Sequence, residues 1–186
     1  YFRSHLDDLI RFHADEILGL EELKATLVCL KQHSPAVAEE IGPGAVPSST
    51  LHNLLKLLLA EGVSIRNQPS IVGSLSVHHG RLGEDPEALL EPVRMALATQ
   101  ISRRLSDESG AIWALVLDSG VEAEMLAQAE SSRGRLNLTP EQARTLLNQI
   151  TEGVEKFRKN GLRPVLAVHA TLRLHLRRLS MKYFPD

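Results

Sequence analysis

The densest apolar segment of the chain lies between Thr50 and Leu75, and it most strongly limits how the first half can fold. Five of its leucines recur at helical spacing and predict one wide apolar stripe: Leu51, Leu54, Leu55, Leu58 and Leu59. One short partner cannot cover so wide a stripe. The rest of the first half should therefore consist of helices that pack around it.

Two boundary signals divide this segment into two helices. A hydroxyl side chain at positions 48–50 is expected to cap the first helix, and Gly62 should end it at about residue 61 by taking a left-handed conformation. Residues 63–65 then form a short extended connector. Asn67 is expected to cap a second helix, which carries Pro69 in its first turn and ends near residue 75.

Further helical patterns occupy the rest of the first half, over residues 4–17, 20–33, 35–41 and 86–105. Gly19 should end the first of these helices. Residues 78–85 are polar and contain glycine, so we expect a loop there. Pro92 lies inside the last pattern and should kink that helix or delay its start.

The periodicity changes after the turn-forming residues 106–110, which suggests domains at 1–108 and 109–186. The apolar runs at 111–117 and 164–168 predict two short buried strands. Helices are expected at 121–130, at 139–160 with a capping box on Thr139, and at 171–183. Strand, helix, helix, strand, helix is a crossover topology with parallel strands, and a further strand is expected beyond Asp186.

The expected fold class is therefore mainly α with a small α/β part: an all-helical N-terminal bundle, followed by the strand-helix-helix-strand-helix domain. Composition adds that the chain has no run of about 18 apolar residues and no signal peptide, so we expect a soluble piece. Its single cysteine, Cys29, excludes an internal disulfide and fits a reducing compartment.

Charge is distributed unevenly between the two halves. Residues 1–110 carry 10 Lys and Arg against 15 Asp and Glu, a net charge of −5, whereas residues 111–186 carry 11 against 8, a net charge of +3. The total of −2, with 4% aromatic residues, argues against nucleic acid as the main partner.

No pattern in the sequence supports catalysis, a metal site or a cofactor. His13 with Glu16, and Cys29 with His33, have the spacing at which side chains on one helix converge, but two ligands without a second pair do not make a metal site. The chain has no GxSxG, Walker-type, CxxC or HExxH motif. We expect a protein that is not an enzyme and holds no cofactor.

The last predicted helix is the most distinctive surface, because its cations recur at like-charge i, i+4 spacing. Its packed stripe is predicted as Leu172, Leu176, Leu179 and Tyr183, and its cations are Arg173, Arg177, Arg178 and Lys182. A solvated face is the simpler interpretation, and contact with an acidic partner is the functional one. With Arg66 and Asn67 at the earlier bend, these four cations are our candidate protein-interaction residues.

Four blocks of this sequence resemble, in the same order, the C-terminal cytoplasmic region of the flagellar and virulence type III export-gate proteins, the FHIPEP or FlhA-type family. They are HADEILGLEEL from His13, LHNLLKLLLAEGVSIRN from Leu51, DPEALLEPVRMALATQI from Asp85 and PVLAVHATLRLHLRRL from Pro164. The resemblance implies the third and fourth subdomains of that region. It also implies an upstream membrane-spanning part, absent here, and a nine-membered ring at the cytoplasmic face of the bacterial inner membrane.

The resemblance therefore implies a non-catalytic module of a flagellar or virulence protein export apparatus. Its expected partners are copies of itself in the ring, other apparatus proteins, and export substrates with their chaperones. The alternative is a helix-turn-helix regulator that reads nucleic acid with residues 68–75. That segment contains no Lys or Arg, which makes it a poor phosphate-binding helix.

Overall fold

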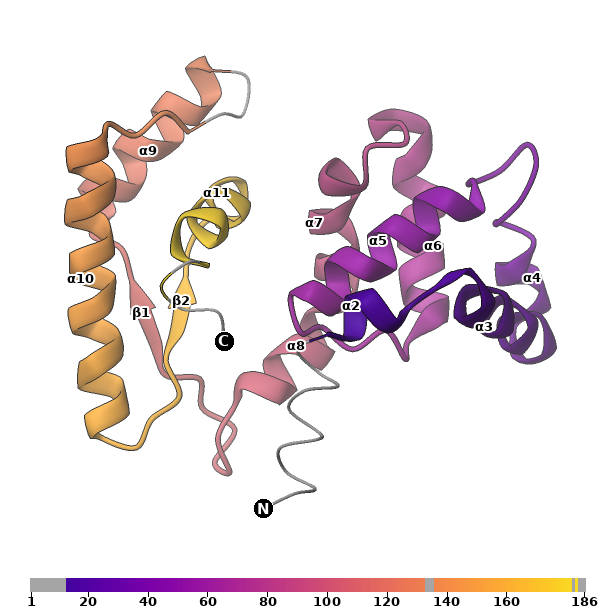
Figure 1. The fold of residues 1–186 in the computed structure, drawn as a ribbon, viewed down its shortest axis with the longest axis horizontal. Helices are drawn as coiled ribbons and strands as arrows, with labels where there is room; N and C mark the ends of the chain where they lie inside the picture. Colours follow the sequence, from indigo (N-terminus) through magenta and orange to yellow (C-terminus); the bar gives the residue numbers. More distant parts are fainter. Residues whose placement is uncertain (1–12, 133–135, 182, 184–186) are drawn as a thin grey trace. The chain divides into compact units, whose positions relative to one another are not determined.

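The computed structural model describes residues 13–132, 136–181 and 183. The chain divides into two compact units, one ending at Ser102 and the other starting at Arg103. Figure 1 shows the helices and strands of each unit. The first is built from helices and the second contains a small parallel sheet, which confirms the predicted fold class. The domain boundary predicted at residue 108 stays a prediction.

The N-terminal unit is a bundle of helices joined by short connections. Its described helices are α2 (Ala14–Ile17), α3 (Leu20–His33), α4 (Pro35–Ala38), α5 (Ser48–Ala60), α6 (Gln68–Leu82), α7 (Pro86–Ala96) and α8 (Ala98–Leu105), the last of which crosses into the second unit. Most of the helix predicted over residues 4–17 lies outside the described residues.

Helix α5 is the centre of this unit, as the leucine stripe predicted. It packs against α2 and α7, while α6 packs against α7 and α4 (Figure 1). Four of its five stripe leucines have no exposed surface, namely Leu51, Leu54, Leu55 and Leu58, and Leu59 packs against the same core. The stripe is therefore the interior of the unit.

The bend between α5 and α6 is built largely as predicted. Gly62 has φ +66°, the left-handed conformation that ends α5. The side chain of Asn67 accepts a hydrogen bond from the Ser70 amide and so caps α6. Two long-range contacts hold the bend against later helices. The Arg94 Nη1–Glu61 Oε2 ion pair measures 2.7 Å, and Gln100 Nε2 donates to the Ser64 carbonyl over 2.7 Å.

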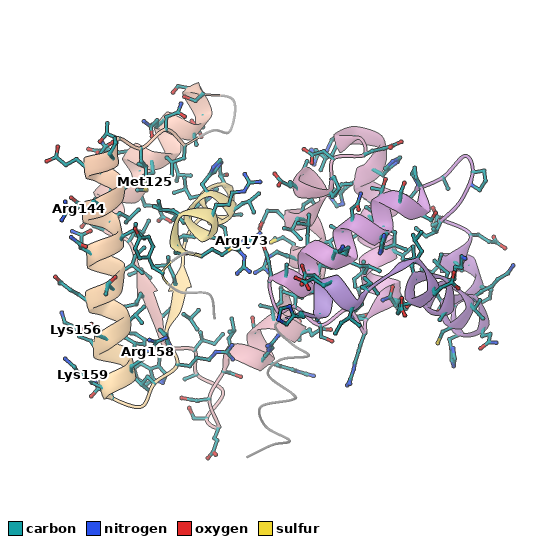
Figure 2. The ribbon with its side chains drawn as sticks, in the orientation of Figure 1. Met125, Arg144, Lys156, Arg158, Lys159 and Arg173 are labelled. Carbon is teal, nitrogen blue, oxygen red and sulfur yellow. The ribbon has the colours of Figure 1, made fainter. Side chains whose placement is uncertain are left out.

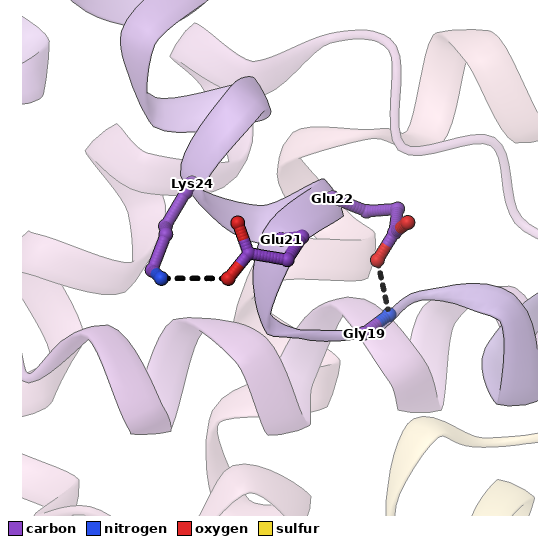
Figure 3. A network of polar contacts seen from close by, with 4 residues as sticks. All are labelled: Gly19, Glu21, Glu22 and Lys24. Atoms are coloured by element: carbon purple, nitrogen blue, oxygen red, sulfur yellow. Dashed lines mark hydrogen bonds and ion pairs between the residues drawn. The ribbon is translucent and has the colours of Figure 1, made fainter.

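Polar contacts also fix the entry to α3. Gly19 precedes the first residue of α3, and its amide donates to Glu22 Oε2 in the first turn of that helix over 3.1 Å. On the same turn Lys24 and Glu21 form an ion pair of 2.7 Å (Figure 3). Nearby, His52 Nε2 of α5 donates to the Leu18 carbonyl over 2.7 Å, which ties α5 to the end of α2.

The structure corrects three predictions for this unit. No hydroxyl at positions 48–50 caps α5, because the helix starts directly after Pro47. Residues 78–82 are not a loop, since α6 continues to Leu82 and ends at Gly83, with φ +73°. The single helix predicted over residues 86–105 is divided at Leu97 into α7 and α8, and Pro92 does not delay the start, because α7 begins at Pro86.

The described residues of the C-terminal unit form two parallel strands and three further helices. Its elements are β1 (Ala114–Val116), α9 (Ser119–Ser131), α10 (Pro140–Lys159), β2 (Val165–Ala167) and α11 (Ala170–Ser180). The strands pair in register from Ala114 with Val165 to Val116 with Ala167. The predicted capping box on Thr139 is present, because Thr139 and Gln142 each accept from the other's backbone amide.

The core of this unit lies among α9, α10 and α11 and one face of the sheet. Its buried residues are Met125, Ala129, Leu146, Ile150, Val154, Leu172 and Leu176. Gly153 lets α10 approach the sheet, since a Cβ there would lie 2.9 Å from Leu115 Cδ1. The strands are shorter and less buried than predicted: Val116 is 74% exposed and Trp113, expected in a buried strand, is 53% exposed.

Candidate protein-interaction surfaces

Helix α11 carries the cations that the sequence pointed to. Leu172 and Leu176 are buried and Leu179 packs against the core, as predicted, but Tyr183 is 62% exposed and so is not part of the packed stripe. A residue at 183 lies beyond the end of α11 at Ser180, so the helical spacing no longer applies to it.

The four predicted basic residues of this helix do not share one environment. Arg173 and Arg177 are half-buried and Arg178 is exposed, while Lys182 lies outside the described residues. The start of α11 is held to α9, because the His169 amide donates to Glu122 Oε1 over 2.7 Å. This hydrogen bond fixes the start of α11 against α9.

A groove of about 540 Å³ lies between α10 and α11. Its apolar lining comes from Pro140, Ala143 and Leu147 on α10 and from Leu179 on α11. Arg144 and Arg178, one from each helix, line it as well, and Figure 2 shows Arg144 on α10. The groove therefore combines aliphatic surface with two cations. It can bind a polypeptide segment that carries both apolar and acidic side chains.

Sequence reasoning included Arg178 but missed Arg144. The signal was present, because Arg144, Asn148 and Thr151 recur at i, i+4 and i+7 on α10 and all line the groove. Which other helix packs beside that stripe depends on the tertiary structure. The sequence pattern of α10 alone therefore could not show that the stripe forms one wall of a groove.

The other basic residues of α10 cluster at its C-terminal end. Lys156, Arg158 and Lys159 are exposed there (Figure 2), where cations complement the negative end of the helix dipole. Arg163, beyond the helix, donates to the Arg104 carbonyl over 3.4 Å. These cations have a sufficient structural explanation.

The candidate residues of the N-terminal unit lie beside a second groove, of about 490 Å³. Arg66 lines it together with Cys29 and His33 of α3. Asn67 does not, and its side-chain oxygen is occupied as the α6 cap. Of this predicted pair, only Arg66 faces a hollow.

The polar chemistry around the second groove is local. His33 Nδ1 lies 2.9 Å from the Cys29 carbonyl oxygen and 3.6 Å from its sulfur, as expected for residues one turn apart. Within the part of the chain that the structure describes, no group of three or more His, Cys, Asp or Glu side chains could hold a metal ion.

One strongly perturbed carboxylate lies in the turn that precedes β1. Asp107 accepts hydrogen bonds from Ser109, from the Ala111 amide and from Trp113 Nε1, at 2.6 to 3.0 Å. Hydrogen bonding by the Ser109 side chain, then by the Trp113 indole and the Ala111 amide, lowers the pKa of Asp107 to about 2. The carboxylate therefore organises this turn and positions the exposed indole.

Comparison with known proteins adds the family. The model of the FHIPEP family matches residues 1–186, the whole chain. The chain belongs to the FHIPEP family. This confirms the resemblance inferred from the four sequence blocks.

Among FHIPEP relatives, the chain is 32% identical over 183 residues to the flagellar biosynthesis protein FlhA of Yersinia enterocolitica, covering 98% of this chain and 26% of that protein. It is 28% identical over 186 residues to FlhA of Bacillus subtilis, covering 98% of this chain and 27% of that protein. The chain thus spans about a quarter of the length of these relatives.

Solved structures share the fold. Chlamydia pneumoniae CdsV matches with a TM-score of 0.79 and 26% identity, over 98% of this chain and 53% of that one. A complex of CdsV and CdsO from the same organism matches with a TM-score of 0.75 and 26% identity, over 98% of this chain and 54% of that one. Nonameric SctV-C from EPEC, at 24% identity and a TM-score of 0.75 over 97% and 54%, supports the fold alone.

The helix-turn-helix interpretation gains nothing from these observations. Helix α6, the proposed reading helix, carries Arg81 as its only Lys or Arg, in its last turn. Helices that read a DNA sequence place basic and amide side chains where the helix enters the DNA groove.

None of the described helices is long and apolar enough to span a bilayer.

Proposed function

We propose that this chain is a non-catalytic docking and assembly module of a type III protein export apparatus, flagellar or virulence. The observation that carries the proposal is FHIPEP membership over the full chain. The proposal places the module at the cytoplasmic face of the inner membrane, in a protein whose upstream part spans that membrane. It acts by presenting rigid helical surfaces to neighbouring subunits, apparatus proteins, export substrates and their chaperones.

Support for an assembly role comes from relatives and from charge. CdsV, a protein of the same fold at 26% identity, is found in a complex with CdsO. In the present chain, opposite net charges on the two halves favour head-to-tail contact between copies. Arg173 and Arg177 of α11 are our candidates for the basic side of that contact, facing the acidic half of an adjacent subunit.

Export in the bacterium that encodes the chain tests the function directly. Deleting the codons for residues 13–181 from the chromosomal gene should abolish the release of type III substrates into the medium, and a plasmid copy should restore it. Immunoblots of the truncated protein establish that it is still made. Normal export by a strain that makes the truncated protein would refute the proposal.

Self-association tests the subunit contact separately. Arg173→Glu with Arg177→Glu should weaken association in sedimentation velocity runs at low salt, and added salt should weaken wild-type association, because exposed charges are screened. The matched control is Arg158→Glu with Lys159→Glu, which makes the same charge change on exposed positions of α10. Equal loss in both double variants would show a net-charge effect instead of a contact through α11.

A further inference from the structure

We propose that the groove between α10 and α11 binds an acidic amphipathic helix of another protein. The inference rests on the proposed docking function and names the kind of partner for one surface. It follows from the shape, the lining and the charge of the groove.

The groove has the length and the lining that suit a short helix. On α10 it runs from Pro140 to Thr151, about 16 Å at the helical rise of 1.5 Å per residue, or roughly three turns. Ala143, Leu147 and Leu179 supply aliphatic surface along it. Helix-in-groove recognition uses apolar anchors at i, i+3 or i+4, and i+7, which span two turns and fit within this length.

The charge of the groove selects the sign of the partner. Among the described residues that line the groove, the charged ones are Arg144 and Arg178, and none is Asp or Glu. The described residues of α11 also include no acid, and the three glutamates of α10, Glu141, Glu152 and Glu155, are not among the lining residues. A helix with carboxylates beside its apolar stripe would pair with both cations while its leucines cover the floor.

A protein helix fits these features better than a nucleic acid does. Single-stranded nucleic acid is held by stacking of bases on aromatic side chains, and among the described lining residues Tyr183 alone is aromatic. The aliphatic floor offers leucine or isoleucine anchors a surface that bases would not use. The partner we infer is therefore a polypeptide.

The test uses the full 186-residue chain and a defined probe. The probe is a fluorescein-labelled synthetic helix of about four turns, roughly 14 residues, with leucine at i, i+3, i+4 and i+7 and glutamate at most other positions. Fluorescence anisotropy measures its Kd. One control peptide replaces each glutamate with lysine, and another keeps the composition but scatters the leucines so that no stripe forms.

Arg144→Glu and Arg178→Glu should each weaken binding of the acidic probe by about tenfold or more, because each places a like charge against its carboxylates. Arg158→Glu, an exposed change on α10 outside the lining, should leave Kd within about twofold. Far-ultraviolet circular dichroism verifies that each variant folds. Amide shifts on adding the probe should cluster at the lining positions, including Asn148 and Leu179.

Several outcomes would overturn the assignment. They are absence of probe binding, equal binding of the lysine or scattered peptide, equal loss in Arg158→Glu, or amide shifts elsewhere. Tighter binding of a single-stranded oligonucleotide would replace the helix by nucleic acid, and competition of the probe with self-association would assign the groove to a second copy. If binding fails while deletion still abolishes export, only the groove assignment falls; if export is unaffected, the docking function falls whatever the peptide does.

Discussion

Replacing Leu55 with alanine should remove much of the stability of the N-terminal unit. Leu55 has no exposed surface and lies in the core around α5. The change deletes three carbon groups at about 0.8 kcal/mol each, about 2.5 kcal/mol of transfer free energy. The cavity left behind raises the expected loss to about 3 to 5 kcal/mol, because the surrounding leucines relax only partly.

The matched control is Leu20→Ala in the first turn of α3, where the leucine is 64% exposed. The same atoms are removed and the same residue enters a helix, but little burial is lost, so the expected cost is below about 1 kcal/mol. Urea unfolding followed at 222 nm gives the free energies. Hydrogen exchange at α5 amides shows that the N-terminal unit is the one affected.

The result that refutes this reasoning is a loss of less than about 1 kcal/mol at Leu55, or an equal loss at Leu20. The first would mean that α5 is not the interior of the unit. The second would mean that helix propensity or the unfolded state, and not burial, sets the difference.

Further predictions concern glycines, a cap and a titration. Gly73→Ala on α6 should raise the free energy of unfolding by about 0.5 to 1 kcal/mol, since a Cβ there meets nothing within 4 Å, as urea titration will measure. Gly153→Val should lower it by about 1 to 3 kcal/mol through collision with Leu115, and an unchanged midpoint would contradict the packing described. Thr139→Ala should cost about 1 kcal/mol by breaking the α10 capping box, measured in the same way. The pKa of Asp107 is depressed to about 2 in the folded state, so its ionised form stabilises the fold. This stabilisation is fully present above the unfolded pKa of 3.8 and is lost as pH falls through 2. Fluorescence of the chain's single tryptophan, whose indole donates to Asp107, should titrate near pH 2 and not in Asp107→Asn; a midpoint near 4 would refute the hydrogen-bonded geometry.

The sequence predicted best those features whose cause is local. The left-handed Gly62, the Asn67 cap and the Thr139 capping box each depend on a few adjacent residues, and each is present. The leucine stripe of α5 likewise needs only helical spacing to be recognised. Such signals carry their physical reason within one or two turns.

Predictions failed where distant packing decides the outcome. Helix α6 continues past Leu75 because it packs against α4 and α7, and the Ser76 hydroxyl donates to Glu40, although Gly80 and two histidines favour a loop. The apolar run at residues 111–117 predicted a buried strand. Instead, the Trp113 indole donates a hydrogen bond to Asp107, and the strand begins only at Ala114. The groove could not be predicted from the sequence for the same reason, because its two arginines come from helices that are distant in sequence.

The separation of cations around α11 gives the two proposed surfaces different tests. Successive residues of an α-helix point about 100° apart, so Arg177 and Arg178 project in different directions although they are adjacent. Arg173 lies one turn before Arg177 and shares its side, whereas Arg178 lines the groove with Arg144. One acidic partner therefore cannot pair equally with both sets. Arg178→Glu should weaken binding of the acidic helix and leave self-association unchanged, and the reversal at Arg173 and Arg177 should do the opposite. If both variants impair both assays equally, α11 acts through its overall charge, and neither surface is specific.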